Sequence, residues 1–559
     1  MQRVFLMFLM IGAFIACDDA AQTKMPDDTA VADTDTVVAA CGDGTVAEDE
    51  VCEPGDTADC TEVTVGYSGT ATCYEDCSGW DMSDCVDTDE CADEPGICGD
   101  ASYASCENTE GAYVCTCANG YVPTSDDKLC VPKYDFEGST YNGDLLLIVN
   151  EDADGNNQAF IGTMPETLLM KSVPATASVE EPPTRPAFRD RVIPLPAHAT
   201  PDRRLGVNRF IEPEPDPVVG DRKYFWAYNF NTGDRYESEA EAVYVGEKCI
   251  MWAQLPVRVS TYAAQDIGKE FDNTIYGLIT ETFYEASDVD QNGKITIFFL
   301  DAGGNAGGYF SSYELYDFED SNRTDMIYIE EMTAQWGDYA VGIIAHEFTH
   351  LVHNNRDELV EELPQMNTWV MEGMSTSGEH VYGGFQSDYK STYNSNDSIA
   401  NGMSVTYWEY TSQDIIGNYA LTYLFHQYLR IHSGQGTALY REIIESEYND
   451  DRDYDAVIQK YIDPELDTAK MLTNFRIALV ANEATGLYGF KKESGFSGIA
   501  RRYWPGAGGN DFYLRGGGAL QIGIDGSFKA PNDSDGGIRY IGIWSGKKAT
   551  VTADEYKGE

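Results

Sequence analysis

The chain has 559 residues, which allows roughly three or four domains of ordinary size. Asp and Glu number 94 against 37 for Lys and Arg, so the formal net charge is −57. This charge would repel a phosphate backbone, and we therefore expect no nucleic-acid partner. Hydrophobic residues make up 42% of the chain, enough to build buried cores, which excludes a protein that is disordered throughout.

The N-terminus and the cysteines indicate a protein that folds outside the cytoplasm. Residues 1–16 combine a short basic start with an apolar run too short to cross a bilayer permanently, which is typical of a signal peptide. Of the 14 cysteines, all but Cys17 and Cys249 fall between Cys41 and Cys130. Such dense cysteines form disulfides, which persist in oxidising compartments.

The segment after the apolar run predicts a membrane anchor. Residues 13–17 (Ala-Phe-Ile-Ala-Cys) resemble the lipobox of bacterial lipoproteins, in which the cysteine is lipidated and becomes the mature N-terminus. Phe14 replaces the usual leucine, and ordinary secretion with cleavage near Ala16 is the alternative. Residues 17–40 are rich in Asp, Thr and Ala, which predicts an acidic tether. We expect an extracytoplasmic protein, lipid-anchored through Cys17 at the bacterial cell envelope or secreted.

Residues 41–86 are predicted to form a small cysteine-rich module. The residues between its cysteines are largely Gly, Asp and Thr, which bury little apolar surface, so crosslinks must supply the stability. The pairing of the six cysteines cannot be deduced from their spacing. The opening Cys41-Gly-Asp-Gly-Thr resembles cysteine-rich repeats of bacterial surface lipoproteins, which favours a spacer role over catalysis. The six are Cys41, Cys52, Cys60, Cys73, Cys77 and Cys85.

Residues 87–131 have a more specific pattern, which opens with Asp-Thr-Asp-Glu-Cys and continues through Cys-Glu-Asn-Thr-Glu-Gly-Ala-Tyr-Val-Cys-Thr-Cys. This pattern resembles the calcium-binding epidermal growth factor-like domain. The resemblance implies calcium held by the side-chain oxygens of Asp87, Glu90 and Asn108, and hard oxygen donors suit this ion. A module that folds on disulfides alone is the alternative. The resemblance also implies the disulfides Cys91–Cys106, Cys98–Cys115 and Cys117–Cys130.

Residues 132–220 are predicted to contain one strand and a proline-rich linker. The apolar run 144–149 is bounded by turn-forming residues and indicates a buried strand. Between residues 172 and 220 lie 10 of the 21 prolines, a density that excludes regular core elements. Arg203-Arg204 in this segment offers a processing site, although an exposed basic pair is the commoner interpretation.

Residues 221–500 are predicted to form the largest domain, beginning with two or three strands between 224 and 254 and an amphipathic helix over 264–286. The loop that opens with Asp288-Val-Asp-Gln-Asn-Gly copies the start of an EF-hand. Its twelfth position is Phe299, where an EF-hand has a bidentate Glu. We therefore expect an acidic turn here rather than a calcium site.

The segment 340–353 has a helical apolar period and contains His346-Glu347-Phe-Thr-His350. Positions i and i+4 share a helix face, so the two imidazoles can bind one metal ion, typically zinc. Glu347 is placed to act as general base toward a water that the metal activates. Two core or surface histidines without metal are the alternative. The motif predicts a catalytic zinc site.

A catalytic zinc needs a third protein ligand and an open position. Glu372 lies 22 residues after His350 in a second predicted helix and is the simplest candidate. Glu379, two turns further on, is expected to form a hydrogen bond with a histidine that binds the metal. A solvated helix face is the alternative for both glutamates, and His353 and His380 are alternative ligands.

These residues resemble the gluzincin metallopeptidases, and more closely the hyicolysin-like bacterial family. The resemblance runs through roughly residues 221 to 480 and includes Gly-Tyr-Phe-Ser from Gly308 and Trp-Val-Met-Glu-Gly from Trp369. Val370-Met371 departs from the usual Leu-Asn. The tetrahedral oxyanion of a peptidase needs a further donor. Tyr419 is our candidate, followed by His380 and Tyr382, and a core tyrosine is the commoner role for such a residue.

Residues 501–559 are Gly-rich with alternating apolar residues and predict a small β-rich segment. The expected fold is therefore multidomain α+β, with two disulfide-rich modules before a gluzincin-like zinc peptidase domain. The expected function is a zinc-dependent endopeptidase of extracellular proteins or peptides, with Zn²⁺ and Ca²⁺ as cofactors. The alternative is a surface adhesin or binding protein with an inactive peptidase scaffold.

Overall fold

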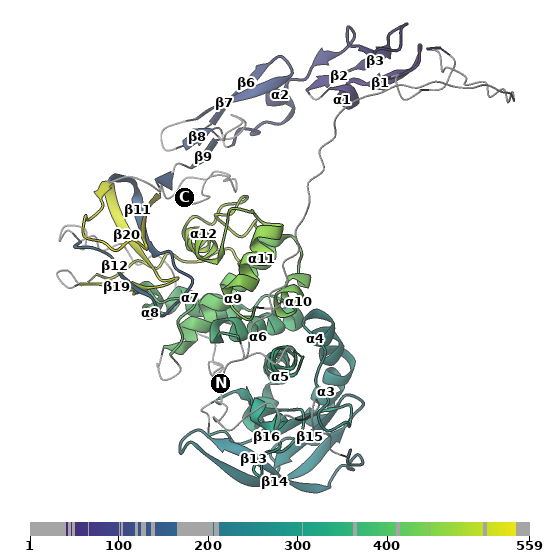
Figure 1. Cartoon of the computed structure of the whole chain (residues 1–559), viewed down its shortest axis with the longest axis vertical. Helices are drawn as coiled ribbons and strands as arrows, with labels where there is room; N and C mark the ends of the chain where they lie inside the picture. The colour runs from purple at the N-terminus through teal and green to yellow at the C-terminus, as the bar shows by residue number, and fades with distance from the viewer. Residues whose placement is uncertain are drawn as a thin grey trace, which may run out of the picture. The chain divides into compact units, whose positions relative to one another are not determined.

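The computed structural model describes residues 41–42, 46, 51–164, 205 and 212–543, apart from short gaps at 65, 100, 102–103, 118–120, 124–129, 133, 136–139, 304–305, 361–365, 410–413, 447 and 507–510. The predicted signal peptide, the acidic tether and Cys17 lie outside these residues. The chain divides into two compact units, Met1–Thr88 and Asp89–Glu559, which are described separately (Figure 1). Among the described residues, no helix has the length and apolarity that a membrane span requires.

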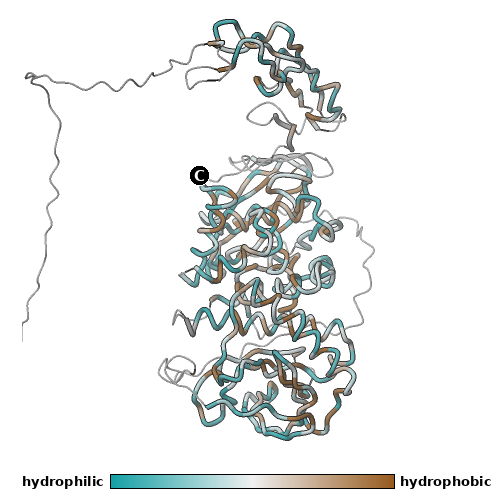
Figure 2. Tube along the Cα trace, turned by 90° about the vertical axis from the view of Figure 1, so that its right-hand side faces the viewer, coloured by the Kyte–Doolittle hydropathy of each residue, from teal (hydrophilic) through white to brown (hydrophobic). Residues whose placement is uncertain are grey.

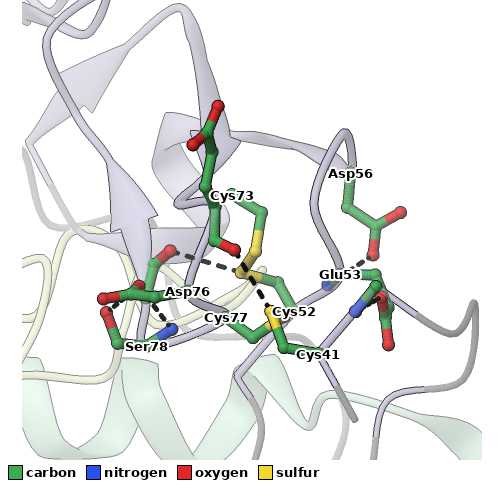
Figure 3. Close-up of a disulfide and its surroundings, with 11 residues drawn as sticks. Cys41, Cys52, Glu53, Asp56, Cys73, Asp76, Cys77 and Ser78 are labelled. Carbon is green, nitrogen blue, oxygen red and sulfur yellow. Dashed lines mark hydrogen bonds between the residues drawn. A yellow bond between two sulfur atoms is a disulfide. The ribbon is translucent and has the colours of Figure 1, made fainter.

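The first unit contains a three-stranded sheet of β1 (Thr57–Asp59), β3 (Thr70–Cys73) and β4 (Trp80–Asp81), the short helix α1 (Cys60–Val63), and the pair β2 (Tyr67–Ser68) and β5 (Val86–Asp87). Its disulfides are Cys41–Cys77, Cys52–Cys73 and Cys60–Cys85. Acidic side chains lie around the first two, and the Gly42 amide donates to Glu53 over 2.8 Å (Figure 3). Ala71 and four disulfide cysteines are the buried hydrophobic residues described here, so crosslinks replace an apolar core.

The second module begins with α2 (Glu90–Asp93) and continues as the hairpin of β6 (Ala104–Thr109) and β7 (Ala112–Cys117). A second pair joins β8 (Tyr121–Pro123) and β9 (Cys130–Pro132). The disulfides are Cys91–Cys106, Cys98–Cys115 and Cys117–Cys130, the same pairs that the sequence resemblance implies.

A four-stranded sheet joins residues from before and after the largest domain. It consists of β10 (Tyr134–Asp135), β21 (Ile538–Ile543), β11 (Thr140–Asn150) and β20 (Ala519–Lys529), in this order. Ile148 in β11 lies opposite Leu520 in β20 and Tyr540 in β21, and all three side chains are buried in one cluster. A smaller pair joins β12 (Gln158–Phe160) and β19 (Tyr513–Arg515).

A six-stranded sheet forms one side of the largest domain. Its order is β13 (Arg222–Asn229), β14 (Asp234–Val245), β15 (Cys249–Gln254), β16 (Ile295–Leu300), β18 (Met326–Glu330) and β17 (Gly308–Phe310). The three strands β15, β16 and β18 are parallel, and the other pairs are antiparallel. Every residue of β16 and β18 is buried, because apolar clusters cover both faces of the sheet. The hydropathy of each residue along the chain is shown in Figure 2.

Helices cover one face of this sheet and form the rest of the domain. They are α3 (Thr261–Glu270), α4 (Tyr276–Thr282), α5 (Gly337–Asn354), α6 (Thr368–Gly383), α7 (Ser387–Ser395), α8 (Asp397–Ala400), α9 (Ile415–Ser433), α10 (Ala438–Ile444), α11 (Asp451–Tyr461) and α12 (Thr468–Ala481). The helix predicted over 264–286 is interrupted by a π-turn, Phe271–Ile275, which keeps both end residues buried. A second π-turn, Asn355–Val360, follows α5, and short 3₁₀ turns (Ser312–Leu315 and Glu331–Trp336) flank β18.

Helix α5 lies between the sheet and α6, which in turn packs on α9 (Figure 1). Two glycines allow α6 to approach both neighbours. A Cβ at Gly378 would collide with the Thr349 hydroxyl of α5, and one at Gly373 would collide with the His426 ring of α9. This close approach places the acidic residues of α6 beside the histidines of α5.

Candidate metal centre

Three side chains from α5 and α6 meet in the interior of the domain. His346 and Glu372 are fully buried and His350 is 7% exposed. Their donor atoms form a triangle: His346 Nε2 lies 3.2 Å from His350 Nε2, and Glu372 Oε2 lies 3.4 Å and 3.5 Å from these two nitrogens. The predicted ligand set is therefore brought together, whereas His353 points to Asp357 at 3.6 Å.

The size and chemistry of this triangle fit zinc. Ligand atoms placed tetrahedrally about 2.0–2.1 Å from a zinc ion lie about 3.4 Å from one another. The three measured edges, 3.2, 3.4 and 3.5 Å, match this spacing. Two imidazoles and one carboxylate are also a usual donor set for catalytic zinc. His346, His350 and Glu372 are thus suited to hold the ion.

The charges in the cluster stabilise a cation between the three side chains. Burial alone would lower the pKa of His346, but hydrogen bonds with Glu372 and Glu379 raise it well above its ordinary value. Burial alone would raise the pKa of the Glu372 carboxyl, but His350 and His346 hold it below its ordinary value. The negative surroundings that stabilise a proton here would also stabilise a divalent cation, which displaces that proton when it binds.

Glu379 determines which nitrogen of His346 faces the triangle. Its Oε1 lies 2.8 Å from His346 Nδ1. Since an ionised carboxylate only accepts hydrogen bonds, Nδ1 carries a proton, and in the neutral ring that a metal requires the lone pair is on Nε2, which faces the other donors. The structure therefore places Glu379 behind a candidate ligand, as the sequence predicts.

Glu347, the candidate general base, is fully buried beside the edge strand β17. A Cβ at Gly308 would lie 2.8 Å from Glu347 Oε1 and 2.9 Å from the Tyr328 carbonyl oxygen. A glycine is therefore required where the backbone of β17 passes the carboxylate.

Comparisons with known proteins now identify the family. Over 429 residues the chain is 30% identical to the neutral metalloprotease ShpI of Staphylococcus hyicus, covering 73% of this chain and 95% of that protein. The chain belongs to the family of this neutral metalloprotease. Residues 87–130 match the family described as calcium-binding EGF domain. These findings confirm the resemblance to a metallopeptidase family and the resemblance to the calcium-binding EGF-like domain.

Other similarities are more limited. Human nidogen-1 is 34% identical over 85 residues, which cover 15% of this chain and 6% of that protein. The structure of native yeast LTA4 hydrolase is 13% identical with a TM-score of 0.24, over 44% of this chain and 42% of that chain.

The three candidate oxyanion donors of this chain lie in different surroundings. The Tyr419 ring is buried in α9, with its centroid 6.3 Å from that of His346 and 5.0 Å from that of Trp408. His380 Nδ1 lies 3.0 Å from the Tyr423 hydroxyl, and the Tyr382 hydroxyl donates to Glu270 over 3.1 Å. Of the three candidates, Tyr419 is therefore the one whose ring lies beside the histidines.

The candidate calcium ligands lie in three different elements, β5, α2 and β6. Asp87 lies in β5 opposite Tyr67, and Asn108 lies in β6 opposite Tyr113. Glu90 begins α2, and its Oε2 is buried without a hydrogen-bond partner among the described residues. A buried carboxylate oxygen of this kind suits a cation ligand.

A second cluster brings together Asp288, Asp290 and Asp325, whose carboxylate oxygens lie within 4.8 Å of one another. These oxygens accept hydrogen bonds from nearby backbone and hydroxyl groups. Gly293 N donates to Asp288 over 3.0 Å, and Thr324 Oγ1 donates to Asp290 over 2.6 Å. These contacts are those of a hydrogen-bonded acidic turn.

Sequence reasoning missed two features of the metal centre. Gly308 was recognised only as part of a family pattern, and its contact with Glu347 depends on strand pairing. Tyr389, whose hydroxyl donates to Glu379 over 2.5 Å, was not recognised at all. It lies in the short polar helix α7, where a tyrosine gives no functional signal.

Proposed function

We propose that this protein is a zinc-dependent endopeptidase that hydrolyses extracytoplasmic proteins or peptides. The observation that carries the proposal is the buried triangle of His346, His350 and Glu372. Glu347 lies on α5, the helix that carries the two histidines. Zinc held there would polarise the scissile carbonyl and acidify the attacking water.

The protein's own residues supply the proton transfers. Glu347 accepts a proton from the attacking water and returns it to the leaving amine. Tyr419, beside His346, is the candidate that stabilises the developing oxyanion. Glu379 holds His346 in the tautomer that presents Nε2.

The modules before the peptidase domain support a location outside the cytoplasm. Six disulfides and the match to the calcium-binding EGF domain support this location. Asp87, Glu90 and Asn108 are the proposed calcium ligands, and Cys17 is the proposed site of a lipid anchor. The boundaries 41–86, 87–131, 132–220, 221–500 and 501–559 remain our proposed division of the chain after residues 17–40.

The test compares bound zinc and casein cleavage in the wild type, Glu347→Gln and Glu281→Gln. The first variant keeps the three donors and removes the general base, and the second changes an exposed glutamate of α4. We expect one zinc per chain in all three proteins. The rate of cleavage should fall by about 10²–10⁴-fold in Glu347→Gln and stay unchanged in Glu281→Gln. A wild type that binds no zinc would instead favour the adhesin, and one that binds zinc without cleaving casein would indicate a latent or highly selective enzyme.

A further inference from the structure

A tyrosine outside the triangle is connected to it through Glu379. Tyr389 lies in α7, is 8% exposed, and donates its hydroxyl hydrogen to Glu379 Oε1 over 2.5 Å. The same oxygen lies 2.8 Å from His346 Nδ1. Two hydrogen bonds therefore join α7 to α5 through one carboxylate oxygen of α6.

The direction of these hydrogen bonds follows from the chemistry of the groups. An ionised carboxylate only accepts, so both Tyr389 and His346 donate to Glu379. Burial, together with the charge of Glu379, raises the pKa of Tyr389 well above its ordinary value, so the hydroxyl keeps its proton. A carboxylate with two donors on one oxygen loses the freedom to rotate away from His346.

Contacts that do not involve the Glu379 carboxylate hold Tyr389 in place. Its ring packs on Tyr423 of α9 with centroids 4.9 Å apart. Gln386, just before α7, donates its side-chain amide to the Glu379 main-chain oxygen over 3.0 Å. The Gln386 backbone amide donates to the Tyr423 hydroxyl over 2.9 Å. Tyr389 is therefore a fixed donor to which Glu379 is attached.

We propose that Tyr389 is a positioning residue of the metal centre, which holds Glu379 so that His346 keeps Nε2 directed at the metal. This inference rests on the proposed zinc site. Mutation of a residue that hydrogen-bonds to a metal ligand typically lowers metal affinity or activity by about 10–100-fold. Since Tyr389 acts one residue further out, we expect an effect near the lower end of this range.

The test compares Tyr389→Phe with Tyr393→Phe. Tyr393 lies one turn further along α7 and is also buried, but its hydroxyl lies 3.4 Å from the Gln521 side chain. Zinc affinity is measured by competition with a chelator, and kcat and KM are measured at saturating zinc. We expect Tyr389→Phe to bind zinc about 10-fold more weakly and to lower kcat rather than raise KM. Tyr393→Phe should match the wild type in both measurements.

A double-mutant cycle with Glu379→Ala separates positioning from general loss of structure. If Tyr389 acts through Glu379, removing its hydroxyl changes zinc affinity little once the carboxylate is absent. An equal loss in both backgrounds, or wild-type zinc affinity in Tyr389→Phe, would overturn the inference. A wild type that binds no zinc would refute the proposed function itself, so the two failures are distinguishable.

Discussion

Two clusters of the largest domain each bring one donor atom from three His, Asp or Glu side chains within 4.8 Å of one another, but they differ in the surroundings of these atoms. In the triangle of His346, His350 and Glu372, donors from two helices face one another at 3.2–3.5 Å. In the cluster of Asp288, Asp290 and Asp325, the oxygens accept hydrogen bonds from their own loop and its neighbours.

The difference lies in what the converging groups contact within the protein. The α5–α6 triangle has the spacing of a coordination shell, and Glu379 fixes the tautomer of one member. In the acidic cluster, Val289 N donates to Asp325 over 2.6 Å, and the carboxylates serve to order a turn.

The largest effect should come from removing one donor in each cluster. We expect Glu372→Gln to lose zinc during dialysis and to lower casein cleavage by at least about 10³-fold, because a neutral amide replaces the anionic ligand. Asp290→Asn should keep both zinc and activity within a few-fold of the wild type. Metal analysis and initial rates measure both.

Two outcomes would contradict these expectations. If Asp290→Asn loses its zinc, the acidic cluster is coupled to the metal centre. If Glu372→Gln retains stoichiometric zinc, another residue supplies the third ligand, and His380 would be the first to test.

A smaller effect is expected at the strand that passes Glu347. In Gly308→Ala the added methyl group would lie 2.8 Å from Glu347 Oε1, so the carboxylate must shift. We expect kcat to fall by about 10²-fold with zinc still bound, because a general base tolerates little displacement. Gly277→Ala is the control, since a Cβ there meets nothing within 4 Å. Full activity in Gly308→Ala would contradict the assigned position of the base.

The smallest effect concerns the pH dependence of stability. Burial raises the pKa of Asp325 to about 7, and the neighbouring carboxylates add to the shift. The folded state therefore binds more protons than the unfolded chain between about pH 4 and pH 7, and stability falls as pH rises through this window. Asp325→Asn removes this titration.

Urea unfolding at pH 6 and pH 8 measures the expected change. From pH 6 to pH 8 the free energy of unfolding of the wild type should fall by about 1 kcal/mol more than that of Asp325→Asn. Parallel pH profiles for the two proteins would mean that Asp325 keeps its charge through this range.

Much of the metal centre could be predicted because its signals are local. The spacing of His346 and His350 places them on one helix face, and Glu372 and Glu379 lie on the helix that follows. Gly308 and Tyr389 could not be assigned roles, because each acts through a contact between elements whose packing no local pattern specifies.

The same reasoning applies to the fold. The run 144–149 predicts a strand, and β11 contains it, but its partners β20 and β21 lie some 370 to 400 residues further along the chain. The spacing of the first six cysteines does not determine their pairing, for a similar reason. Several pairings are compatible with one spacing, and packing selects among them.

The sheet that joins β11 to β20 and β21 also determines what a proteolytic nick would do. A cut between residues 165 and 204, for example at Arg203-Arg204, would break the covalent connection between the disulfide modules and helices α5 and α6, but not the pairing of β11. The buried strand β11, paired on both sides, would keep the two fragments together. Such a protein would migrate as two bands on a denaturing gel and elute as one particle from a sizing column.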